Sequence, residues 1–144
     1  MDYYINANEQ LDGAKVLAEA EKYRLAVTLL CLSCELFIKS LVELKAPNNP
    51  LLDSHDIVGL GRLVRNDVDY VQLAPNLAFL RKYLNDSRYP FNVNIYTQEF
   101  YEECLEKVLF VRKEIDLANA KKSNIEKLSK KFGSNNVTDE TKKS

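Results

Sequence analysis

The residues best suited to chemistry lie in a few short stretches, and the first is a pair of opposite charges. Glu35 and Lys39 are four residues apart with the glutamate first, which is the favourable order for a helical ion pair. They interrupt a strongly apolar segment, residues 25–42, where an unpaired charge is costly to bury. We therefore expect each charge to meet the other, a cleft or an interface, either as a structural pair or as part of a site.

Two further candidates follow in the sequence. His55, the only histidine, lies at the expected start of a short helix, where it serves either packing or a site. The stretch Asp86-Ser87-Arg88-Tyr89-Pro90 is a polar loop with two interpretations. In one, Arg88 pairs with Asp86 and Tyr89 fills the end of the fold. In the other, Arg88 binds a phosphate or carboxylate while Tyr89 stacks on a ring.

Cysteine spacing gives a weaker signal. Cys31 and Cys34 have the two-residue gap of metal and redox sites, but only Cys104 and His55 remain as further ligands, far apart in sequence. Within an apolar helix, cysteine acts as a small hydrophobic residue. We predict buried thiols and no metal site. No Gly-rich phosphate loop or nucleophile elbow occurs among only four glycines, so no cofactor is expected.

Composition limits the elements that position these residues. The chain has 144 residues, 46% hydrophobic, with four glycines and four prolines, which favours long uninterrupted helices in one domain. Residues 1–120 carry 13 Lys and Arg against 18 Asp and Glu, a balance of −5, whereas residues 121–144 carry 7 against 3, a balance of +4. We predict a helical bundle over 1–120 and a basic, partly disordered tail over 121–144, and no electrostatic footprint for DNA or a membrane.

Hydrophobic periodicity predicts an all-α, up-and-down bundle of about five helices with a long C-terminal helix. The helices are expected after the caps Asn6 and Asn8, over residues 23–44, after Asp53 and Ser54, from Pro75, and from the N-cap Thr97 with a hydrophobic staple between Tyr96 and Tyr101. The charges in residues 25–42 argue against a membrane span. The start of the chain lacks a signal-peptide pattern and the cysteine count is odd, so we expect a cytoplasmic location.

Taken in order, several fragments of the chain resemble the HEPN domain family (higher eukaryotes and prokaryotes nucleotide-binding). The matching residues are Ala14, Leu17, Tyr23, Ala26, Glu35, Lys39, Leu41, His55, Ile57, Leu60, Tyr83 and Ser87-Arg88-Tyr89-Pro90. The match covers about residues 7–118 and suits the branch whose fourth helix ends in an Arg-Tyr-Pro signature.

The resemblance implies a bundle that commonly forms homodimers, with polar residues near the dimer cleft. Family members act as metal-independent ribonucleases, as partners of minimal nucleotidyltransferases in toxin–antitoxin pairs, or as nucleotide-binding modules. The nuclease members carry an Arg followed after four to six residues by a His. This chain departs from that pattern, because Asn48, Asn49 and Pro50 precede His55 and residues 93–95 follow Arg88 without a His. Asn94 cannot replace a histidine as general base.

We therefore expect a non-catalytic HEPN-type module that binds a nucleotide, RNA or a partner protein, such as a minimal nucleotidyltransferase, through a polar cleft. The expected site or interface residues are Glu35, Lys39, His55, Asp86, Arg88 and Tyr89. One alternative is a metal-independent endoribonuclease in which folding brings His55 to Arg88. The other is a purely structural dimerisation module without a ligand.

Overall fold

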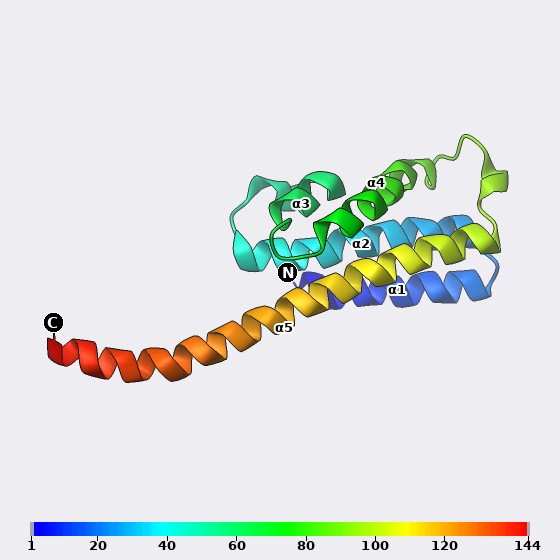
Figure 1. The fold of residues 1–144 in the computed structure, drawn as a ribbon. Coiled ribbons are helices and arrows are strands. Elements are labelled where there is room, and N and C mark those ends of the chain that lie inside the picture. The colour runs from blue at the N-terminus through cyan, green and yellow to red at the C-terminus, as the bar shows by residue number, and fades with distance from the viewer. Residues whose placement is uncertain (1, 144) are drawn as a thin grey trace.

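The computed structural model describes residues 2–143, with side chains described up to residue 131. Its helices are α1 (Tyr3–Glu19), α2 (Tyr23–Lys45), α3 (Ile57–Leu63), α4 (Tyr70–Asp86) and α5 (Gln98–Lys143), with short 3-10 turns η1 (Pro50–Asp53) and η2 (Val93–Ile95). The predicted all-α bundle with a long C-terminal helix is confirmed. Figure 1 shows α1 and α2 as an antiparallel hairpin, with α5 along it and α3 and α4 on the opposite side from α1.

The bundle is organised around α2, which packs against α1, α3, α4 and α5. By length and composition alone α2 could cross a membrane, but 67% of its apolar window is buried inside the fold. The core joins Leu11 of α1, Phe37 of α2, Leu80 of α4 and Ile115 of α5, all 0% exposed. The apolar character of α2 is therefore accounted for by packing on several sides.

The three thiols belong to this core, as predicted. Cys31, Cys34 and Cys104 are free and buried, and the Cys31 thiol lies 3.4 Å from the carbonyl oxygen of Leu80. Burial raises the pKa of each thiol, that of Cys104 to about 12, because the thiolate is poorly solvated there. The thiols therefore act as small apolar groups.

Two helices begin at different caps from those predicted. Asp2, not Asn6 or Asn8, caps α1, because its carboxylate accepts a hydrogen bond from the Ile5 amide. For α3, the N-cap is Asp56, whose carboxylate accepts from the Gly59 amide at 3.0 Å. The expected cap residues Asp53 and Ser54 instead end η1. Several Asx and Ser side chains compete near each helix start, and only backbone geometry selects the cap.

The start of α4 was also wrongly predicted. The helix begins at Tyr70 with Asp69 as N-cap, so Pro75 lies inside it and not at its first position. Proline has no amide hydrogen, so the carbonyl of Val71 lacks its usual helical partner.

Thr97 does cap α5, because its hydroxyl accepts from the Phe100 amide at 3.2 Å. The Tyr96 ring packs edge-on against Phe100, with centroids 5.6 Å apart, whereas the predicted staple paired Tyr96 with Tyr101. Both tyrosines are nevertheless buried. This arrangement fixes the direction in which the chain enters α5.

The predicted tail is described only in part. Residues 121–131 continue α5, and most of their side chains are exposed. The side chains from residue 132 onward, where partial disorder was predicted, lie outside the described residues. The division of the chain at residue 120 stays a prediction.

A close approach between α3 and α4 gives a test of the fold. A Cβ at Gly61 would overlap the Leu77 side chain, and both residues are buried. We expect Gly61→Ala to lower the free energy of unfolding by about 1–3 kcal/mol, despite a gain in helix propensity of up to about 1 kcal/mol. Urea unfolding followed by circular dichroism measures this change.

The matched control is the same substitution in a Leu77→Ala background, where the obstructing side chain is gone. There, Gly61→Ala should be neutral or stabilising relative to Leu77→Ala alone. An equal loss in both backgrounds would show that the contact is not the cause.

Candidate functional site

Three of the predicted site residues meet at one buried carboxylate. Glu35 lies in the middle of α2 and is 3% exposed. Its Oε2 is 3.1 Å from Nζ of Lys39, which is 5% exposed. Its Oε1 is 3.0 Å from Nδ1 of His55, in the segment between η1 and α3. The predicted pairing of Glu35 with Lys39 is thus present, and the histidine joins it from twenty residues away in sequence.

The Glu35 carboxylate determines which ring nitrogen of His55 carries the proton. Nδ1 of His55 must donate its proton to Glu35, so the neutral ring carries its lone pair on Nε2. The His55 side chain is 71% exposed, so the ring contacts solvent while one edge stays bound. Chemically, the cluster is a compensated ion pair with one accessible imidazole. Structurally, it ties the segment before α3 to α2.

The loop after α4 is arranged differently from its first interpretation. Asp86 accepts hydrogen bonds from the Tyr96 hydroxyl and from the Phe91 amide, and no ion pair between Asp86 and Arg88 is found in the described residues. Tyr89 is 88% exposed, whereas Tyr96 is 8% exposed and fills the buried position. Burial, reinforced by the bond to Asp86, raises the pKa of Tyr96. Of the two interpretations of this loop, the one in which Arg88 pairs with Asp86 and Tyr89 fills the end of the fold does not agree with these contacts.

Residues at the start of α2 hold this loop in place, and the sequence interpretation missed them. Arg24 donates to the carbonyl oxygen of Ser87 at 2.8 Å and approaches that of Arg88 at 3.4 Å. The hydroxyls of Thr28 and Ser87 are 2.7 Å apart, and Ser87 is fully buried. One signal was available, because a cation in the first turn of a helix opposes the helix dipole and indicates a partner elsewhere.

The result is a braced loop that displays three side chains. Arg88 is exposed and, within residues 2–131, its guanidinium pairs with no carboxylate. Beside it, Tyr89 is 88% and Phe91 100% exposed. A free guanidinium next to exposed aromatic rings can bind a phosphate and stack on a base.

The two clusters are separate within one chain. Arg24, which holds the loop, lies eleven residues before Glu35 on α2, or about 16 Å along the helix axis. The structure thus brings Glu35, Lys39 and His55 into contact. Asp86, Arg88 and Tyr89 lie at the end of α4 and in the loop that follows it. Within one chain, the expected site residues therefore form two clusters joined by α2.

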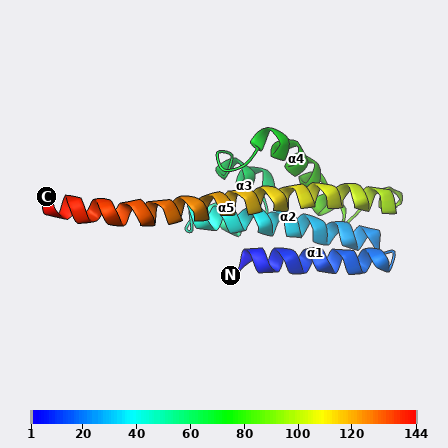
Figure 2. The same ribbon diagram turned by 60° about the horizontal axis from the view of Figure 1, so that its bottom comes forward.

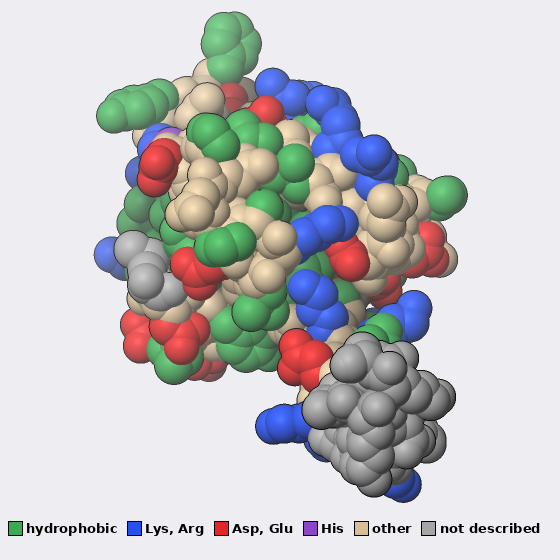
Figure 3. All heavy atoms as spheres, turned by 90° about the vertical axis from the view of Figure 1, so that its left-hand side faces the viewer, with side chains coloured by type: hydrophobic (Ala, Val, Ile, Leu, Met, Phe, Trp, Pro, Cys, Tyr) green, Lys and Arg blue, Asp and Glu red, His purple; other side chains and the backbone are tan. Residues whose placement is uncertain are grey.

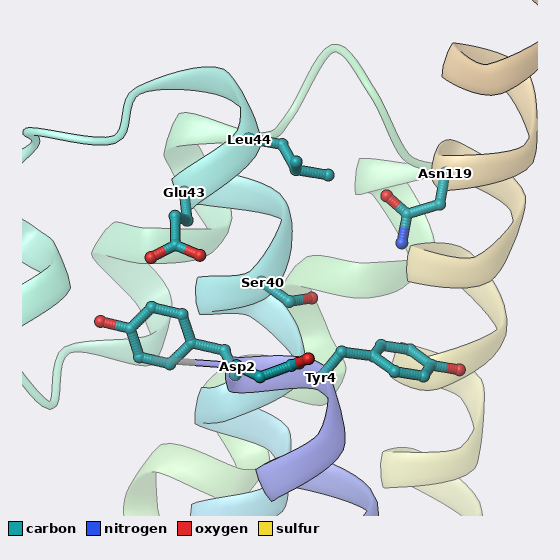
Figure 4. A pocket seen from close by; sticks show the side chains of 7 residues that line it. Asp2, Tyr4, Ser40, Glu43, Leu44 and Asn119 are labelled. Atoms are coloured by element: carbon teal, nitrogen blue, oxygen red, sulfur yellow. The ribbon is translucent and has the colours of Figure 1, made fainter.

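A third feature is a hollow of about 370 Å³ between the start of α1, the end of α2 and α5 (Figure 4). We call it the Asn119 hollow; it is lined by Asp2, Tyr3, Tyr4, Ser40, Glu43, Leu44 and Asn119. Oδ1 of Asn119 is buried without a hydrogen-bond partner. Partial burial raises the pKa of Tyr3, with nearby Glu43 adding to the effect. None of the predicted site residues lines it, and no group of metal-ligating side chains is found in the described part of the chain.

Because Glu35 and Lys39 are buried, we expect the loss of Lys39 to lower the free energy of unfolding more than the loss of Lys45 does. Lys39→Met leaves a carboxylate in the core without its lysine, so we expect the free energy of unfolding to fall by about 3 kcal/mol or more. Lys45 also pairs with a carboxylate, that of Asp67 at 2.9 Å, but both side chains are partly exposed. We expect Lys45→Met to cost less than about 1 kcal/mol. Urea unfolding compares the two.

A second variant separates charge from packing. Replacing the pair together, by Glu35→Leu with Lys39→Met, should recover most of the stability, because no buried charge remains. Equal losses for the two single lysine variants would contradict the assignment of Glu35 as a buried, compensated charge.

The comparisons with known proteins agree with this architecture. The family model described as HEPN domain matches residues 1–123. No curated protein and no solved structure matches the chain significantly. Because the family model spans most of the chain, including both polar clusters, the chain belongs to the HEPN domain family.

Proposed function

We propose that this HEPN domain is a non-catalytic module that binds a nucleotide at the loop after α4. Arg88 contacts the phosphate and Tyr89 stacks on the base. The observation that carries the proposal is an exposed guanidinium that pairs with no carboxylate within residues 2–131 and is next in sequence to an 88% exposed tyrosine. Both belong to a loop whose backbone is held by Arg24.

The hydrogen bonds that hold the loop favour a binding role for its exposed side chains. Arg24, Thr28 and the Asp86–Tyr96 bond fix the backbone on both sides of Tyr89. A site that is already ordered loses less conformational entropy when a ligand binds. Large aromatic side chains held in water by an ordered loop are typical of recognition surfaces.

The charge of the bundle favours a short ligand. A balance of −5 over residues 1–120 repels a long phosphate backbone, whose binding depends on neutralising many charges. One guanidinium and one ring are enough for a mononucleotide or the end of an RNA strand. The nucleotide is therefore the leading ligand.

The non-catalytic part of the proposal rests on the separation of His55 from Arg88. His55 is bound to Glu35 at the middle of α2, whereas the loop that carries Arg88 is held by Arg24 at the start of α2. Arg88 and His55 of one chain therefore do not form the Arg–His pair that a nuclease of this family would need.

Calorimetric titration with ribonucleoside mono- and triphosphates tests the proposal. We expect saturable binding by the wild type and about 10-fold to 100-fold weaker binding by Arg88→Ala, because a hydrogen bond to a charged group contributes about 1.5–3 kcal/mol. Tyr89→Ala should weaken binding about tenfold through lost stacking, while Tyr89→Phe should bind nearly as well as the wild type.

Arg81→Ala is the matched control, because Arg81 is an exposed arginine on the preceding α4 surface and its loss changes the net charge equally. Absence of binding heat for every nucleotide, or equal weakening by Arg81→Ala, would overturn the assignment of the loop as the site.

The endoribonuclease alternative is tested separately. We expect labelled single-stranded RNA to stay intact with purified protein, without divalent metal, from about pH 5 to 8, the range in which an imidazole titrates. Electrophoresis of the RNA measures this. Cleavage that is lost in His55→Ala would refute the non-catalytic proposal and support the alternative.

A further inference from the structure

The Asn119 hollow lies at the end of the bundle from which α5 extends (Figure 2). Its walls come from three helices, namely the start of α1, the last turns of α2 and the part of α5 around residue 119. Its volume of about 370 Å³ falls within the range of small-molecule sites, about 300–1,000 Å³. The hollow is therefore large enough for a small organic molecule.

One polar atom in the wall of the hollow is buried without a partner. Oδ1 of Asn119 accepts no hydrogen bond, and in Figure 4 the Asn119 side chain points from α5 into the space between Leu44 and Tyr4. A buried carbonyl oxygen without a donor is costly, and such atoms are rare in folded proteins. A ligand that donates a hydrogen bond to Oδ1 would remove this cost.

Two other polar side chains of the hollow also present lone pairs. The Ser40 hydroxyl donates its proton to the carbonyl oxygen of Phe37 at 2.6 Å, so its oxygen is left as an acceptor. Oδ1 of Asp2 accepts from the Ile5 amide, and within residues 2–131 the second carboxylate oxygen of Asp2 makes no hydrogen bond. The hollow is therefore best suited to a ligand that is rich in donors.

The charge of the hollow is negative. Asp2 and Glu43 belong to its lining, and no lysine, arginine or histidine is found among the described residues that line it. Within residues 2–131, neither carboxylate forms an ion pair. Figure 3 faces this end of the bundle and shows the Lys and Arg side chains mostly at its upper right and around α5. A positive group in the hollow would therefore meet two carboxylates that nothing in the lining compensates.

The remaining walls favour an organic cation over a metal ion. The rings of Tyr3 and Tyr4 line the hollow together with Leu44, which is 61% exposed. The Tyr4 ring is held edge-on against Phe37, with centroids 5.5 Å apart. Aromatic rings attract ammonium groups, and Leu44 offers an apolar contact to a carbon chain. No group of three or more metal-ligating side chains is found in the described part of the chain.

We propose that the Asn119 hollow binds a small alkyl diamine with both amines protonated. One ammonium group donates to the Glu43 carboxylate, and the other donates to Asp2 and to Oδ1 of Asn119. In Figure 4 Glu43 and Asn119 lie on opposite sides of the hollow, with Asp2 between them. Two positive charges joined by a short carbon chain match this arrangement, and the chain lies against Leu44 and the two tyrosine rings.

Calorimetric titration with putrescine at about pH 7, where both of its amines are protonated, tests the proposal. We expect saturable binding and a raised Tm, and neither effect with butanediol, which has the same carbon chain without charge. Glu43→Gln should weaken binding about 10-fold to 100-fold, because a hydrogen bond to a charged group is lost. Glu106→Gln is the matched control, since Glu106 is an exposed glutamate of α5 outside the hollow.

Two further variants separate binding from stability. Asn119→Leu removes the buried unpaired carbonyl at similar volume, so the Tm of the ligand-free protein should stay equal or rise, while putrescine should bind about tenfold more weakly. A residue that served packing alone would show a lower Tm and unchanged affinity. Asp2→Asn should also weaken binding with little change in Tm, because asparagine caps a helix about as well as aspartate does.

Three outcomes would overturn the proposal. The first is the absence of both binding heat and a Tm rise with putrescine. The second is equal binding of butanediol, which would indicate an apolar crevice and not a site for a cation. The third is equal weakening by Glu43→Gln and Glu106→Gln, which would mean that putrescine responds to the net charge of the bundle and not to the hollow.

Discussion

The carboxylate of Glu35 lies in the most enclosed helix of the bundle, and its charge has to be balanced there. Lys39 balances it from one turn along α2, but His55 arrives from the connection to α3, so the balance also fixes where that connection runs. Two further contacts position the elements after His55. The α3 helix packs on α4 at Gly61, and Arg24 holds the backbone of Ser87 at the end of α4. The buried charge thus fixes where the segment between η1 and α3 meets α2.

The second organising role of α2 is at its first turn. Arg24 and Thr28 hold the end of α4 from the start of the helix that Glu35 occupies at its middle. Both polar clusters therefore depend on a single straight element whose other faces are packed. The α2 helix therefore packs its apolar side chains in the core and makes polar contacts at two separate places, one with the loop after α4 and one with the segment before α3. It also explains why the predicted site residues form two groups and not one cleft.

Hydrophobic spacing was sufficient to predict the helical bundle and the burial of the thiols, because these follow from local periodicity. Helix starts were less predictable, since Asp2, Asp56 and Asp69 were each one of several side chains able to cap. The pairing of Glu35 with Lys39 is local and was predicted. The contacts of Glu35 with His55 and of Arg24 with Ser87 span 20 and 63 residues. They depend on how helices pack, which no short pattern encodes. Asp86 had two acceptable partners nearby, and burial of Tyr96 decided between them.

The continuity of α5 has a mechanical consequence. The helix starts one residue after Thr97, at the edge of the Arg88–Tyr89 loop, and runs unbroken beyond the bundle. From Gln98 to Lys121 it spans about 35 Å. A continuous helix transmits axial shift and twist better than a jointed one does. The Arg88–Tyr89 loop and the stretch 121–131 are therefore connected by one continuous helix, which couples these two places.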